Sequence, residues 1–272
     1  MRKISSFILI LFLISGSFMN CRKKHKVPPI LPPAETMLID FSNFILTSGA
    51  TVNVFNVKGT DDANWRIVAE IASPWRTLTD VTLSVPLTAY KTVAGYNASI
   101  VSGNKWEWSC NTSISGATYK VRLIGETSGS QVKWEMYVSR DGTGGFTEFK
   151  WLDGTSNIAG TEGKWTLYED HTAQTTALLQ IDWTRSGTKI EKVKYTYVKE
   201  GQSKNAYIEF GPASGGYDFY YTVHYYNTTL GKFSDVNIEW NHTSKVGRIQ
   251  SADYLDGAWK CWDAQKINVA CN

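Results

Sequence analysis

The chain is poor in charged residues and in cysteine, and it has no long hydrophobic run. Charged residues are 19 % of the 272 residues, and four cysteines are too few to build a disulfide-rich scaffold. No segment reaches the roughly 18 consecutive apolar residues of a transmembrane helix. Seven prolines and 22 glycines exclude collagen-like and proline-rich low-complexity chains. Aromatic residues are abundant, at 13 %, so the chain has ample material for a folded core.

The formal net charge of +3 conceals an uneven distribution of basic residues. Six of the 28 basic residues and none of the 25 acidic residues lie in residues 1–33. The remaining chain therefore has 22 basic residues against 25 acidic ones and is slightly acidic. Nucleic-acid binding requires a basic patch or stripe, which the body of this sequence lacks, so no nucleic-acid partner is expected.

The start of the chain has the composition of an export signal. A basic start, with Arg2 and Lys3, precedes eight apolar residues at positions 7–14. These eight residues would span only about 12 Å as a helix. A single cysteine, Cys21, follows this run. The arrangement resembles the signal of bacterial lipoproteins. The resemblance implies that residues 1–20 are removed and that Cys21 becomes the lipidated first residue. The alternative is an ordinary signal cleaved after Ser17, which leaves Cys21 unmodified.

The residues after Cys21 have the properties of a membrane tether. Residues 22–26 are Arg-Lys-Lys-His-Lys, and cations near anionic lipid add on the order of 1 kcal/mol each to membrane binding. Residues 27–33 contain four prolines and favour a polyproline II stalk of roughly 20 Å. We therefore expect a lipid-anchored tether at residues 21–33. Some surface-exported lipoproteins carry acidic residues here, so the basic run favours an outer-membrane protein that faces the periplasm.

Residues 61–95 have the periodicity of amphipathic helices. Apolar side chains recur every three or four residues and fall on one helical face. They are Trp65, Val68, Ala72, Trp75, Leu78 and Val81. Ser73-Pro74 is expected to interrupt the helix, Ser84-Val85-Pro86 to restart it and Gly95 to end it, which predicts two or three short helices. For residues 37–41 a first strand and a short helix are equally compatible with the sequence.

From residue 104 onward the hydrophobic period changes to two, which is typical of β-strands. In residues 131–140, for example, Val132, Trp134 and Met136 alternate with Lys133 and Glu135. Short segments rich in glycine and polar residues separate such runs, and no helical segment lies between them. Connections this short indicate antiparallel hairpins, and the pattern predicts about 11 to 13 strands in sequence order.

A flat open sheet of this size is expected to curl, split or close. We therefore expect residues 34–272 to form one mainly β domain, a long antiparallel up-and-down meander curled into a half-barrel or barrel. The short helices would pack in its concavity, and a two-sheet sandwich is the alternative. This organisation resembles, in architecture alone, the periplasmic lipoprotein carriers and receptors, which combine an N-terminal helix with a half-barrel of antiparallel strands.

The sequence contains no recognisable catalytic or metal-binding motif. His171, His224 and His242 are far apart in the chain, and no HExxH, CxxC, G-x-S-x-G or Walker pattern occurs. We therefore expect no metal and no cofactor, and we assign no catalytic residue. A Ser-His-acid set or a pair of carboxylates assembled by the fold would still make an envelope hydrolase, so the enzyme question stays open.

One stretch, residues 217–226, is aromatic on both faces of the expected strand. Tyr220, His224 and Tyr226 occupy the face opposite the apolar one. Aromatic rings with polar tips suit amphipathic ligands or sugars, so these three residues are candidate ligand contacts. Pairing with aromatic residues of neighbouring strands would explain the same pattern without any ligand.

Export also implies an oxidising compartment, in which disulfides persist. Cys261 and Cys271 would close a short loop and fasten the end of the chain, which leaves Cys110 as a buried free thiol beside Trp108. The rival pairing joins Cys110 to one of the late cysteines and would indicate a closed barrel.

The sequence therefore favours a membrane-tethered, non-catalytic lipoprotein. It would bind an apolar or amphipathic ligand between the sheet and the helices. The alternative is a glycan- or protein-binding module of the cell envelope that uses exposed aromatic residues.

Overall fold

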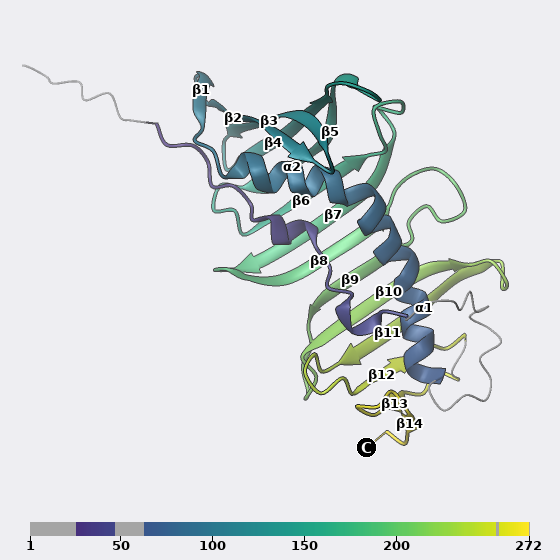
Figure 1. Cartoon of the computed structure of the whole chain (residues 1–272). Helices are drawn as coiled ribbons and strands as arrows, with labels where there is room; N and C mark the ends of the chain where they lie inside the picture. The colour runs from purple at the N-terminus through teal and green to yellow at the C-terminus, as the bar shows by residue number, and fades with distance from the viewer. Residues whose placement is uncertain (1–25, 47–62, 254–255, 272) are drawn as a thin grey trace, which may run out of the picture.

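The computed structural model describes residues 26–46, 63–253 and 256–271, and within them it contains one open antiparallel sheet (Figure 1). Fourteen strands pair only with their neighbours in sequence, and β1 and β14 form its two edges. The expected mainly β meander is confirmed as an open, curled sheet, with one strand more than the upper end of the prediction. The strands are β1 (Ser99–Ser102), β2 (Lys105–Ile114), β3 (Ala117–Ser128), β4 (Gln131–Arg140), β5 (Phe146–Asn157), β6 (Glu162–Tyr168), β7 (Ala177–Ser186), β8 (Lys189–Tyr197), β9 (Tyr207–Pro212), β10 (Phe219–Asn227), β11 (Lys232–Trp240), β12 (Gly247–Gln250), β13 (Lys260–Trp262) and β14 (Asn268–Val269).

The two faces of the sheet differ sharply in chemistry. On β4, Val132, Trp134, Met136 and Val138 are fully buried on the inner face, which the helices cover. The residues between them point to the outer face, as the alternation of a strand requires. The inner faces of β2 to β13 together form the sheet side of the aromatic core of the protein, whereas β1 and β14 are exposed.

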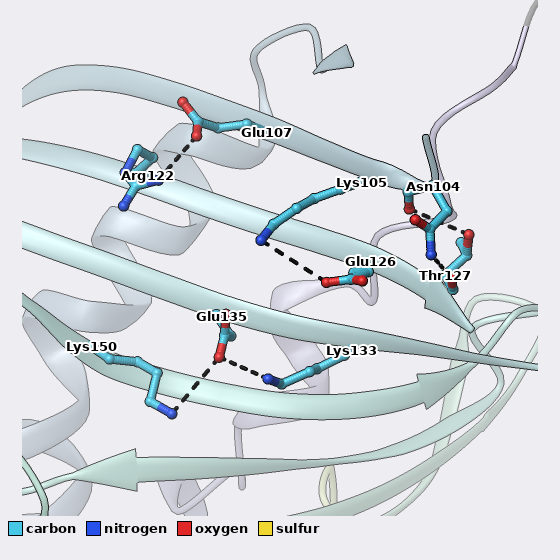
Figure 2. A network of polar contacts seen from close by, with 9 residues as sticks. All are labelled: Asn104, Lys105, Glu107, Arg122, Glu126, Thr127, Lys133, Glu135 and Lys150. Atoms are coloured by element: carbon cyan, nitrogen blue, oxygen red, sulfur yellow. Dashed lines mark hydrogen bonds and ion pairs between the residues drawn. The ribbon is translucent and has the colours of Figure 1, made fainter. Parts of the chain in front are cut away.

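The outer face of β2 to β5 carries ion pairs, most of them between strands (Figure 2). The guanidinium of Arg122 lies 3.1 Å from Glu107 and 2.8 Å from Glu148. Glu135 lies 3.0 Å from the ammonium of Lys133 and 3.9 Å from that of Lys150. Exposed pairs of this kind contribute at most about 1 kcal/mol each, so they keep this face solvated more than they stabilise the fold.

A long helix runs along the inner face of the sheet (Figure 1). It consists of α1 (Ala63–Leu78), a π-helical turn (Thr79–Leu83) and α2 (Ser84–Ala94), which follow one another without a break. The predicted end at Gly95 is confirmed, but the predicted interruption at Ser73-Pro74 is wrong. Pro74 removes one helical hydrogen bond, and the burial of its neighbours Ala72 and Trp75 offsets that loss.

The π-helical turn also changes which residues face the sheet. Trp65, Val68 and Trp75 are buried as the helical period predicts, whereas Val81 is 72 % exposed. A π-helical turn contains more residues than an α-helical turn, so it rotates the apolar stripe relative to the simple period. Leu83, which is 1 % exposed, takes the core position expected for Val81.

The N-terminal part of the described chain lies on the inner face of the sheet beside the helix. It contains two short 3₁₀ helices, Ala34–Met37 and Ser42–Phe44, so of residues 37–41 Met37 ends the first helix and residues 38–41 form neither a strand nor a helix. The first 3₁₀ helix contacts α2, β7 and β8, and the second contacts α1. Met37, Ile39 and Phe44 are buried there. We call residues 32–44 the inner segment.

The polar tips of core aromatic side chains hold the backbone of the inner segment in place. The hydroxyl of Tyr195 donates to the carbonyl of Met37 at 2.7 Å and accepts from the N–H of Ile39 at 3.2 Å. The hydroxyl of Tyr221 donates to the carbonyl of Asp40. These bonds satisfy backbone groups that have no partner within a regular helix or strand.

Further aromatic tips extend this set of contacts to both ends of the inner segment. The hydroxyl of Tyr90 donates to the carbonyl of Pro32 at 2.5 Å. The indole N–H of Trp165 donates to the hydroxyl of Thr36 at 3.1 Å. Packing against the core therefore begins at Leu31 and Pro32, inside the part of the chain that the sequence indicates as a tether.

The C-terminal end is fastened by a disulfide between Cys261 and Cys271, whose Cα atoms are 5.2 Å apart. The bond holds β14 and the last residues against β13, where Trp262 is 1 % exposed. Cys110 is a free thiol on the inner face, as expected, but it is half-buried and not enclosed in the core. Partial burial raises the pKa of this thiol above its ordinary value.

Candidate functional site

The inner segment fills the middle of the space between the sheet and the helix, where the sequence predicts a ligand. An open cleft of about 550 Å³ remains farther along α1, between this helix and the turns that follow β8 and β10. A cleft of this size lies within the range of small-molecule sites. Its lining residues are Glu70, Ile71, Pro74, Trp75, Leu78, Tyr197, Ser203, Ala206, Tyr225, Tyr226, Asn227, Thr228 and Thr229.

The helical wall of the cleft is apolar because of the spacing of its residues. Ile71, Trp75 and Leu78 recur at three and four residues and therefore lie on one side of α1. Pro74 lies on the same stretch of the helix and contributes a ring that has no N–H donor. This wall can contact the apolar part of a ligand but offers it few hydrogen bonds.

The opposite wall combines aromatic side chains with hydroxyl groups. Tyr197 ends β8, and Tyr225 lies on the inner side of β10. Burial raises the pKa of the Tyr225 hydroxyl, so this group is a neutral hydrogen-bond donor at physiological pH. Thr228 and Thr229 follow in the β10–β11 turn. The cleft is thus amphipathic, with one apolar wall and one mixed wall.

Two of the polar side chains in the walls of the cleft are buried. Glu70 is 8 % exposed and stands in an otherwise apolar stretch of α1. Asn227 is 1 % exposed, and its Oδ1 accepts from the N–H groups of Thr229 and Leu230 at 3.1 Å each. Its Nδ2 atom has no hydrogen-bond partner among the residues that the structure describes. A buried donor without a partner is costly, but protein atoms cover this Nδ2, so a ligand acceptor reaches it only if a neighbouring side chain moves.

The three candidate contacts predicted from sequence lie on the outer side of β10. The hydroxyl of Tyr220 donates to Glu209 at 2.8 Å, and burial raises the pKa of this hydroxyl. The imidazole Nδ1 of His224 lies 2.7 Å from the carboxylate of Asp235. Tyr226 alone of the three lines the cleft. The structure therefore brings these residues onto one face but places only one of them at the cleft.

Neighbouring strands supply the ring contacts of His224 and Tyr226. The imidazole of His224 stacks between Tyr207, at 5.3 Å, and Phe233, at 4.4 Å between ring centroids. Tyr226 meets the edge of Phe233 at 5.5 Å, and the ammonium of Lys194 lies 3.7 Å from the ring of Tyr207. We call Lys194, Tyr207, His224, Phe233 and Tyr226 the outer ladder. Cross-strand pairing accounts for its geometry.

The described residues contain no cluster of three or more His, Cys, Asp or Glu side chains with the geometry of a metal site. The same part of the chain has no helix long and apolar enough to cross a bilayer. Residues 1–20 and Cys21 lie outside the described residues, so the expected signal and lipidation site stay predictions.

Comparisons with known proteins give no relative from which a role could be transferred. No protein-family model, no curated protein and no solved structure matches this chain. Its function must therefore be inferred from its own residues.

Most residues of the cleft were missed by the sequence analysis. One signal was available, because Glu70 is a carboxylate in the apolar run Ile67-Val68-Ala69-Glu70-Ile71. A charged residue in such a run is rarely buried unless it is paired or functional. Asn227 gave no comparable signal, since Asn before a turn is ordinary turn chemistry.

Proposed function

We propose that this protein is a membrane-tethered, non-catalytic lipoprotein of a bacterial envelope that binds a small amphipathic or apolar ligand. The binding site is the cleft between α1 and the turns after β8 and β10. The protein is anchored through Cys21 on the outer membrane and faces the periplasm. It uses no metal and no cofactor.

The observation that carries this proposal is the chemistry of the cleft. Its volume of about 550 Å³ accommodates a small molecule but not a folded protein. Ile71, Trp75 and Leu78 offer apolar contact on one side, and the hydroxyl groups of the opposite wall, at Tyr225, Thr228 and Thr229, offer hydrogen bonds on the other. A ligand with an apolar body and one polar acceptor satisfies both walls.

A probe-binding measurement tests the cleft. We expect the neutral fluorophore N-phenyl-1-naphthylamine to bind the purified chain at one saturable site. Leu78→Glu places a carboxylate on the apolar wall at a half-buried position. Loss of the apolar contact is expected to weaken probe binding about tenfold or more. Thermal unfolding of the variant checks that its fold is retained.

The outer ladder provides the matched control and tests the alternative function. Its half-exposed aromatic rings are the surface that a glycan- or protein-binding module would use. Tyr207→Ser removes a ring of the ladder that stacks on His224, outside the cleft, and is expected to leave binding of the naphthylamine probe unchanged. Loss of binding in Tyr207→Ser, with normal binding in Leu78→Glu, would assign the site to the outer face instead.

The tether is tested independently by removing the expected lipid. Cys21→Ala is expected to release the protein from the membrane fraction into the soluble periplasmic fraction. A salt wash of the membranes separates lipid anchoring from adsorption of the basic residues. A variant that still sediments with washed membranes contradicts lipidation, and digestion of the unmodified protein on intact cells contradicts the periplasmic orientation.

A further inference from the structure

We propose that one end of the sheet docks on the lipid bilayer and inserts exposed apolar side chains beside the lipid anchor. Val27, Tyr96, Ile100 and Val101 form this surface, which we call the β1 end. Among the described residues, eleven large hydrophobic side chains are exposed, and these four are between 50 % and 80 % exposed. The inference rests on the lipidation of Cys21 in the proposed function.

Several contacts bring the members of the β1 end together. The ammonium of Lys26, next to Val27, donates to the carbonyl of Gly103 in the β1–β2 turn. Tyr96 lies in the short link between the end of α2 and the start of β1. Figure 1 shows the first described residues, the end of α2 and β1 at the same end of the molecule.

The turn that follows β1 is tied to the neighbouring strands. Asn104 lies in the β1–β2 turn, and its carbonyl accepts from the N–H of Thr127 at 3.0 Å, while its side-chain amide donates to the carbonyl of Thr127 (Figure 2). Lys105 pairs with Glu126 on the adjacent strands at 4.0 Å. These contacts fix the β1–β2 turn on β3, and β1 itself pairs with β2.

β1 has no charged residue and no proline, which protect many edge strands in water. Its backbone edge is protected instead by its length of four residues and by a register shift between Ile100 and Ser102. All four residues of β1 are nevertheless exposed, among them Ile100 and Val101. These two exposed branched aliphatic side chains indicate a surface that is covered in the working state of the protein.

The length and charge of the preceding chain identify the bilayer as the covering surface. Cys21 precedes Lys26 by five residues, which limits the separation of their Cα atoms to about 17 Å. Lipidation of Cys21 therefore keeps the β1 end within that reach of the membrane. Residues 22–26 are basic and match the charge of anionic headgroups. Tyrosine beside aliphatic residues is also typical of surfaces that lie at the lipid interface.

Docking through the β1 end also determines in which direction, relative to the bilayer, the cleft opens. Successive turns of an antiparallel meander alternate between the two ends of its strands. The β10–β11 turn and the β1–β2 turn therefore lie at opposite strand ends of the sheet. Figure 1 shows the end of the β10–β11 hairpin on the side away from β1. The cleft therefore opens away from the bilayer, and its ligand enters from the aqueous compartment.

Fluorescence of a single attached probe tests the docking. The full lipidated chain with Cys110→Ser and Ile100→Cys is labelled with a nitrobenzoxadiazole group and reconstituted on vesicles of phosphatidylethanolamine and phosphatidylglycerol. We expect a blue shift, a rise in emission of about twofold or more, and quenching by lipids with nitroxide-labelled acyl chains, because the probe enters the interface. Leu230→Cys, at an exposed apolar position in the β10–β11 turn, is the matched control and shows none of these changes.

The possible outcomes separate the docking from the tether. A labelled chain that sediments with vesicles but shows no change at position 100 overturns the docking and leaves the lipid anchor intact. A chain that does not sediment with vesicles refutes the tether. A spectral change that follows protein concentration in the absence of lipid indicates pairing of β1 edges between two copies and overturns insertion into the bilayer.

Discussion

Gly154→Ala is expected to destabilise the protein by about 3 kcal/mol, because neighbouring atoms already occupy the space for a Cβ atom. A Cβ at this position would lie 2.2 Å from the carbonyl oxygen of Lys164 and 2.6 Å from Cε3 of Trp165. In register, Gly154 lies opposite Trp134 on β4 and Trp165 on β6. The backbone of β6 would have to move away from β5 to accept the methyl group.

Chemical denaturation of the variant measures this effect. Gly95→Ala is the matched control. Gly95 has a φ of −78°, which any residue can adopt, and the atom nearest to an added Cβ would be the carbonyl oxygen of Thr92, at 3.4 Å. The control is expected to change stability little, or to raise it by up to about 1 kcal/mol. Equal unfolding midpoints for Gly154→Ala and the unmodified protein would show that the sheet relaxes around the added group.

The same close contact recurs along the sheet and explains how so many tryptophans fit on one face. Trp134 would collide with a Cβ at Gly125, and Trp183 with a Cβ at Gly163. A large indole thus lies over a neighbouring strand that carries no side chain at that position. A protein core is densely packed and leaves little free space. A tryptophan on one strand must therefore face a glycine on the next strand.

The strands were predictable from sequence because their alternation is a local property. Val132, Trp134 and Met136 identify the inner face of β4 without any knowledge of its neighbours. The pairing of Gly154 with Trp165 was not predictable, because it depends on the register between strands. Register is set by turn geometry and by the packing of the whole face, and a single sequence does not reveal it.

The parts that sequence analysis missed are those stabilised by distant residues. The inner segment has no periodicity of its own, and two of its backbone partners, Tyr195 and Tyr221, lie more than 150 positions away. The cleft likewise combines Glu70 of α1 with Asn227 of β10. Val81 shows the same limit on a smaller scale, since a π-helical turn is not visible in a 3.6-residue period.

Folding stability is expected to fall steeply above about pH 10, the ordinary pKa of tyrosine. Burial raises the pKa values of Tyr90, Tyr195 and Tyr221 above that value in the folded protein. The unfolded chain then loses these protons as the pH rises through 10, while the folded chain keeps them. The stability that the three hydroxyls contribute is fully present below pH 10 and is lost above it, by about 1.4 kcal/mol per pH unit for each tyrosine.

Tyr195→Phe separates this contribution from other effects of alkaline pH. The variant is less stable at neutral pH by about 1 to 3 kcal/mol, because Met37 and Ile39 lose their buried hydrogen-bond partner. Its stability also falls less steeply above about pH 10, since one of three titrating groups is absent. Urea denaturation at a series of pH values measures both quantities. An unchanged slope in Tyr195→Phe would mean that the contacts between the inner segment and the buried tyrosines do not govern unfolding in base.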